Sequence, residues 1–191
     1  AFAKSDYTGS DASLGLAAFG VFISKASTSG SFLAYIENGG QNITADALDV
    51  ISDYQACADA RTTTPGSGVS VTLLSGSVNL AEAQVNANAS NLSGRASLTT
   101  EGNVHVGKEI NLRIQGHGSA NAKSIGSKLA VSGVNIAVTD VYAYMRMNQA
   151  AYISNTGTIQ AGNVTVESLV VNANSSAVSS QPTGAKEIGL L

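Results

Sequence analysis

The sequence predicts an all-β protein, a right-handed parallel β-helix (β-solenoid) built from about three modules of roughly 60 residues. Three observations support this prediction. Related segments recur at a nearly constant spacing, apolar and polar residues alternate with the period of a strand, and the 191 residues are dominated by small side chains. We expect one domain, with modules at about 1–65, 66–126 and 127–184 and the start of a further repeat at 185–191.

Two short motifs define the repeat. The first is headed by an asparagine and reads N-I-T-A, N-V-H-V and N-V-T-V, with spacings of 61 residues (42 to 103) and 60 residues (103 to 163). The second is headed by a glycine that is followed by valine, as in G-V-F-I and G-V-N-I. The residues predicted to occupy equivalent structural positions are Asn42, Asn103 and Asn163, and Gly20, Gly68 and Gly133.

The segments after the asparagines alternate as strands do. In the second copy Val104 and Val106 precede a predicted corner at Gly107-Lys108, and a second alternating run follows. In the third copy the alternation changes phase at Glu167-Ser168, which predicts a similar corner. Residues 45–61 fit either an amphipathic helix or a strand; the matching segments are poor helix formers, so we favour a strand.

A further motif, A-Y-I-x-N, occurs at 34–38 and 151–155, and its middle counterpart is predicted at 85–91. Residues 1–5 resemble 120–124, and 184–191 resemble 126–133, so the chain begins and ends within a module. This indicates either a fragment of a longer array or a subunit whose ends meet other copies.

The expected stack has two or three coils in each module. Six to nine coils at the usual strand spacing of about 4.8 Å would make a rod of roughly 30–45 Å. A β-sandwich is the main structural alternative, because short strands with turns also suit it. It does not explain the 60-residue repeat.

Composition argues against several functions. A net charge of −3 with 12 % charged residues does not favour nucleic-acid binding, and no apolar run is long enough to span a membrane. Cys57 is the only cysteine, so no internal disulfide is possible, and it is expected to be a small buried side chain. Residues 1–6 lack the features of a signal peptide, which is expected to be absent or removed.

No catalytic, cofactor-binding or metal-binding residues are predicted. The densest carboxylates are Asp46, Asp49, Asp53 and Asp59, which are expected to be solvated on an outer face. His105 is expected to point outward where Thr44 and Thr165 do, and His117 to lie in a turn between two glycines. Large side chains gather at 142–147; one face should be core and the other a contact strip, with Tyr142 and Tyr144 on one face and Met145 and Met147 on the other.

The order of G-V-x-[VI], A-Y-I-x-N and G-N-V-T-V resembles the repeat region of leukotoxin-type filamentous adhesins, which are large bacterial surface proteins similar to filamentous haemagglutinins. This resemblance covers nearly the whole chain. It implies a secreted or surface-displayed β-helix shaft from a diderm bacterium, with no catalytic residues.

We therefore expect a structural and adhesive module of an extracellular filament that is not an enzyme. The expected partners are other copies stacked end to end and a host-surface or glycan ligand, with no nucleic acid and no membrane span. The alternative is a carbohydrate-active enzyme, a polysaccharide lyase or hydrolase, on the same scaffold. An ice-binding or mineral-binding solenoid ranks last, because Thr44, His105 and Thr165 do not make a regular threonine row.

Overall fold

The computed structural model describes residues 2–8, 14–63, 69–86, 94–125 and 129–180. Within these residues the chain forms strands and no helix. A short first strand, β1 (Phe2–Thr8), precedes three sets of four. The first set is β2 (Leu14–Thr28), β3 (Phe32–Asn38), β4 (Ile43–Ala45) and β5 (Leu48–Thr63). The second is β6 (Val69–Val85), β7 (Gly94–Thr100), β8 (Val104–Val106) and β9 (Glu109–Ile125). The third is β10 (Leu129–Met145), β11 (Gln149–Asn155), β12 (Ile159–Gln160) and β13 (Asn163–Ser180).

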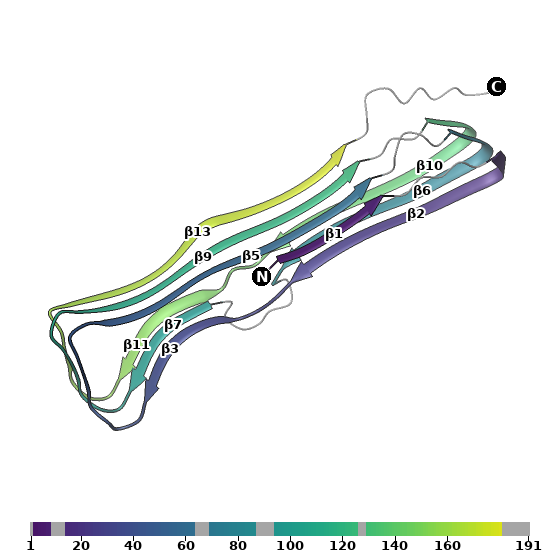
Figure 1. Ribbon diagram of the computed structural model, residues 1–191. Helices are drawn as coiled ribbons and strands as arrows, with labels where there is room; N and C mark the ends of the chain where they lie inside the picture. The colour runs from purple at the N-terminus through teal and green to yellow at the C-terminus, as the bar shows by residue number, and fades with distance from the viewer. Residues whose placement is uncertain (1, 9–13, 64–68, 87–93, 126–128, 181–191) are drawn as a thin grey trace.

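Each strand pairs in parallel with its counterpart in the neighbouring set. The resulting sheets have the orders β1-β5-β9-β13, β2-β6-β10, β3-β7-β11 and β4-β8-β12. Each set runs along β2 and β3 (or their counterparts), turns at one end of the molecule, and returns along β5 (Figure 1). The predicted all-β class with parallel sheets is confirmed, and the pairing is consistent with a parallel β-helix.

Each repeat contributes a single layer to this stack. Leu48 pairs with Ile110 (48 to 110), and Val104 pairs with Ile159 (104 to 159), so one step between neighbouring strands takes a whole repeat. The prediction of two or three coils in each module is therefore wrong. The strands are instead long: the 18 residues of β13 extend for about 60 Å, whereas the four strands of its sheet span only about 14 Å between the outer ones.

The strands form because inward positions are apolar or small at every second residue. In β5 the side chains of Val50, Ser52 and Tyr54 are buried, while those of Ile51 and Asp53 are exposed. The same alternation continues to Thr62, which confirms the strand predicted over most of 45–61 and excludes the helix.

The corner predicted at Gly107-Lys108 is present. The Gly107 and Lys108 amides donate to the carbonyls of Ala45 and Asp46, at 2.9 and 2.8 Å, and so join two layers. The corner predicted at Glu167-Ser168 is not found, because β13 continues through it. The phase changes instead where Val170 pairs with Gly116 and Asn172 pairs with the next residue, His117. This leaves one extra residue in β13, as in a β-bulge.

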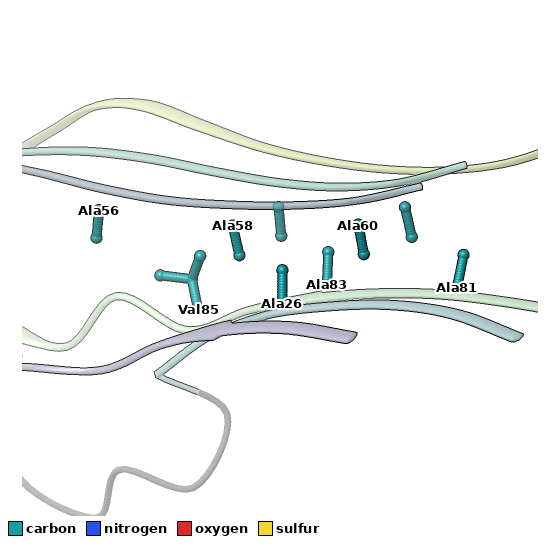
Figure 2. Close-up of a cluster of buried hydrophobic side chains, with 9 residues drawn as sticks. Ala26, Ala56, Ala58, Ala60, Ala81, Ala83 and Val85 are labelled. Atoms are coloured by element: carbon teal, nitrogen blue, oxygen red, sulfur yellow. The ribbon is translucent and has the colours of Figure 1, made fainter. Parts of the chain in front are cut away.

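The core has two regions that lie along the same strands. At one end the facing sheets meet through short side chains that point toward one another (Figure 2). We call this the alanine end; its buried members are Ala26, Ala56, Ala58, Ala60, Ala81, Ala83, Val85, Ala120 and Ala122. At the other end, toward β3, β7 and β11, the core contains larger side chains. We call this the branched end; its buried members are Val50, Tyr54, Ala96, Leu98, Val104, Val106, Ile110, Leu112 and Ile114.

The N-terminal strand joins the alanine end. Ala3 pairs with Ala58, which in turn pairs with Ala120. The predicted likeness of residues 1–5 to 120–124 therefore places β1 in the right sheet, two residues out of register. Residues 184–191 and 64–68 lie outside the described residues.

Candidate interaction surfaces

The asparagine motif marks equivalent positions in two layers but not in the third. The Asn103 amide donates to Asn42 Oδ1 at 2.9 Å, and Asn103 Oδ1 accepts from the Thr158 amide at 3.0 Å. Thr158 therefore occupies the third position. Asn163 lies further along the chain, where it pairs with Glu109. The sequence alignment fails there because the third layer reaches this corner 55 residues after the second (103 to 158), whereas the second follows the first by 61.

The glycine motif does not mark equivalent positions either. Gly20 pairs with Ser77, and Ser77 pairs with Ala137, four residues beyond Gly133. Gly68 lies outside the described residues.

Other glycines form the ladder that the motif was expected to form. A Cβ atom on Gly102 would lie 2.1 Å from the backbone oxygen of Gln41, and one on Gly157 would lie 2.5 Å from the backbone oxygen of Gly102. Glycine is therefore required at these two corners, because each touches the backbone of the preceding layer. Proximity of Gly102 to residue 41 could not be foreseen from one layer alone.

The two A-Y-I-x-N copies do occupy equivalent positions, on β3 and β11. They flank β7, so the middle counterpart is 94–100 rather than the predicted 85–91. Tyr35 and Tyr152 point outward on either side of Ser97, which is almost completely buried although it faces outward. The Arg95 guanidinium lies 5.0 Å from the centre of the Tyr35 ring, within range of a cation–π contact. This creates a small aromatic and cationic patch.

The outer side of β5, β9 and β13 is polar, and we call it the polar face. Side chains pair there between layers: Asn111 Nδ2 donates to Asp49 Oδ1 at 2.9 Å, and Arg113 Nε lies 3.3 Å from Glu167 Oε2. His117 Nε2 lies 3.8 Å from Asp53 Oδ1. These pairs hold neighbouring layers in register.

The aspartates of the polar face do not converge. Asp49 and Asp53 are four residues apart on one strand, which is about 13 Å, beyond the roughly 5–9.5 Å that separates glycosidase carboxylates. Asp59 lies six residues further along β5. Asp46 is exposed at the corner, where Lys108 Nζ lies 2.7 Å from its Oδ2. The four aspartates are thus spread along the surface.

The remaining singled-out residues also lie on outer surfaces. His105 is exposed and aligned with Thr44 and Gln160, not with Thr165, and its Nδ1 lies 3.0 Å from Gln160 Oε1. His117 was predicted in a turn, but it lies within β9. The structure places Cys57 outward and partly exposed, not in the core, where it pairs with Phe2.

The outer side of β2, β6 and β10 is apolar instead, and we call it the apolar face. Its rows run across the three layers, with Val21, Val78 and Val138 aligned in one row. In the next row Phe19 and Ile136 flank Gly76, and the Phe19 ring occupies the space that a Cβ on Gly76 would need. The face also includes Ile23, Leu74, Leu80 and Val134.

The tyrosine strip predicted at 142–147 continues the apolar face. Tyr142 and Tyr144 lie on the outer side of β10 with their ring centres 6.3 Å apart and nearly parallel. Met145 and Met147 point the other way, where they pack against the alanine end and the branched end. The split into one core face and one outer face is confirmed.

No group of three or more His, Cys, Asp or Glu side chains is arranged to hold a metal ion in the described part of the chain. Among the same residues there is no helix long and apolar enough to cross a membrane. No protein-family model, curated protein or solved structure matches this chain.

Proposed function

We propose that this chain is a right-handed β-solenoid module of a secreted or surface-displayed bacterial filamentous protein, where it acts as a structural shaft that presents adhesive surfaces. Parallel connections are right-handed in almost all known cases, which supports this sense of winding. The resemblance of the repeat motifs to filamentous adhesins supports the cellular setting, and the paired A-Y-I-x-N copies lie at equivalent positions, as a true repeat requires.

The observation that carries the shaft proposal is the open side of the third layer. Val164 and Val166 continue the columns of Ile110 and Leu112, with which they pair. Ile110 and Leu112 are completely buried, whereas Val164 and Val166 are 46 % and 45 % exposed. A further layer with the same alternation would cover these valines and extend the parallel sheets. That layer is supplied by more repeats of the same kind or by another copy of the chain.

The adhesive part of the proposal is supported by the patch on β3, β7 and β11. Tyr35 and Tyr152 are exposed aromatic rings with polar hydroxyl groups, and Arg95 adds hydrogen-bond donors between them. Amphipathic aromatic rings and arginine are the side chains most enriched at binding surfaces. We assign a host-surface or glycan ligand to this patch.

Electron microscopy of the purified chain tests the shaft. We expect rods whose length grows with protein concentration, because copies stack through the third layer. Val166→Glu places an uncompensated charge in the stacking surface and should shorten the rods to single chains. Thr165→Glu is the matched control, since Thr165 is the next residue and points outward. Rods that are equally long in both variants, or single particles at every concentration, would refute end-to-end stacking.

A further inference from the structure

The apolar face leaves large hydrophobic side chains in water in the middle of a sheet. Val78 belongs to the central strand β6 and is 42 % exposed, and its neighbours Val21 and Val138 are more exposed still. The polar face on the opposite side of the molecule carries charged and amide side chains at the matching central positions. A contiguous apolar patch rather than scattered single residues marks an interaction surface.

The size of the apolar face fits a second sheet of the same kind. From Val134 to Tyr144 it extends for about 34 Å along β10, and three strands give a width of about 14 Å. The projected area is thus about 500 Å² for each partner, near the lower limit of specific interfaces, which average about 800 Å² a side. Flat sheets pack face to face about 10 Å apart, and the Phe19 ring fills the gap over Gly76 that would otherwise interrupt the surface.

The charges on this side of the molecule lie at one end only. Lys25 Nζ lies 2.7 Å from Glu82 Oε2, and Asp140 is exposed beside them. The other end, around Leu74 and Val134, carries no charged residue on these strands. If two copies met with their strands in the same direction, the Asp140 carboxylates would face each other. With the strands in opposite directions, each charged end lies beyond the apolar overlap and stays in water.

We propose that the apolar face binds the same face of a second copy of this chain, about a two-fold axis parallel to the stacking direction, with the strands of the two copies running in opposite directions. The contact is isologous, as in most dimers. Because the axis follows the stacking direction, each added layer adds about 160 Å² to the contact. Lateral pairing therefore strengthens when layers accumulate. It does not depend on end-to-end stacking, since the two contacts use different surfaces.

Sedimentation equilibrium of the 191-residue chain from about 1 µM to about 1 mM tests the proposal over the range of weak affinities. The Val166→Glu background keeps end-to-end stacking from contributing. We expect a reversible monomer–dimer equilibrium. Val78→Lys should weaken it at least tenfold, because the lysine would be buried without a partner at the centre of the contact. Gln115→Lys is the matched control, on the central strand β9 of the polar face, and should leave the equilibrium unchanged.

Three results would overturn the proposal. One is a monomer at every concentration. Another is equal weakening by Val78→Lys and Gln115→Lys, with circular dichroism showing both variants folded. The third is binding of phosphatidylcholine vesicles that Val78→Lys abolishes while no dimer forms, which would assign the face to lipid. The orientation has its own test: opposed strands predict dimerisation that hardly changes with NaCl, whereas facing Asp140 carboxylates would make salt strengthen it.

Discussion

The alanine end and the branched end of the core are built on the same strands, yet their side chains differ greatly in size. β5 supplies Tyr54 to the branched end and Ala58 to the alanine end, and β9 supplies Leu112 and Ala120 in the same way. The pairing between layers is parallel and continuous through both ends. Side-chain size, and not backbone pairing, therefore distinguishes the two ends.

This difference separates two tasks. A fully buried leucine or isoleucine contributes about 1.5–3 kcal/mol, whereas an alanine methyl group contributes much less. The branched end should thus hold most of the hydrophobic stability. At the alanine end the facing sheets meet through methyl groups, which leaves no room for larger side chains (Figure 2). That end sets the spacing of the sheets rather than the stability.

Leu112→Ala should produce the largest loss and test the first task. Leu112 is completely buried in the middle layer, between Val50 and Val166. Removing its side chain leaves a cavity that layers on both sides cannot fill, so we expect the free energy of unfolding to fall by about 3 kcal/mol in urea titrations. Arg113→Ala, the adjacent outward residue, is the control and should cost less than about 1 kcal/mol. A loss below that of the control would move the stability elsewhere.

The branched end was also the region that the sequence predicted best. Val104, Val106, Ile110, Leu112 and Ile114 alternate cleanly, and all five are buried. Local alternation suffices to assign such residues to a core face, because it depends only on the strand period. The two methionines and two tyrosines of β10 were sorted to the correct faces for the same reason.

Register between layers was beyond local alternation. The repeat steps differ, with 62 residues from Leu48 to Ile110 and 54 from Glu109 to Asn163, so a constant 60-residue period misaligned Asn163 and Gly133. The apolar face was missed as well. Phe19, Val78 and Ile136 become one surface only when three layers are stacked, and each alone reads as an ordinary strand residue.

Ala58→Leu should have a smaller effect and tests the second task. Ala58 is completely buried between Ala3 and Ala120. A leucine there forces the facing sheets apart, and overpacking of this kind costs about 1–3 kcal/mol. We expect a loss of about 2 kcal/mol in the same urea titrations. Asp59→Leu adds a leucine on the outward side of the same strand and should change stability little. If Ala58→Leu were neutral, the alanine end would have unused space and would not set the sheet spacing.

Tyr54→Phe should have the smallest effect, and only the branched end can show it. The Tyr54 ring stacks on Phe32 with centres 4.7 Å apart, and its hydroxyl donates to Gln149 Oε1 at 3.1 Å. Losing this bond should cost about 1 kcal/mol at neutral pH. Burial also raises the pKa of Tyr54 above its usual value of 10.0.

The raised pKa gives Tyr54 a signature in alkaline solution. Above about pH 10 a tyrosine of the unfolded chain loses its proton while the buried Tyr54 keeps it, so the folded state binds more protons and stability falls as pH rises. Below that pH both states are protonated and the group contributes no slope. Urea titrations between pH 9 and 11 should show a shallower decline for Tyr54→Phe than for the unmodified chain, and an unchanged decline for Tyr142→Phe, whose ring is exposed. Equal slopes in all three proteins would mean that water reaches the Tyr54 hydroxyl, and that the branched end is more open than its buried valines, leucines and isoleucines require.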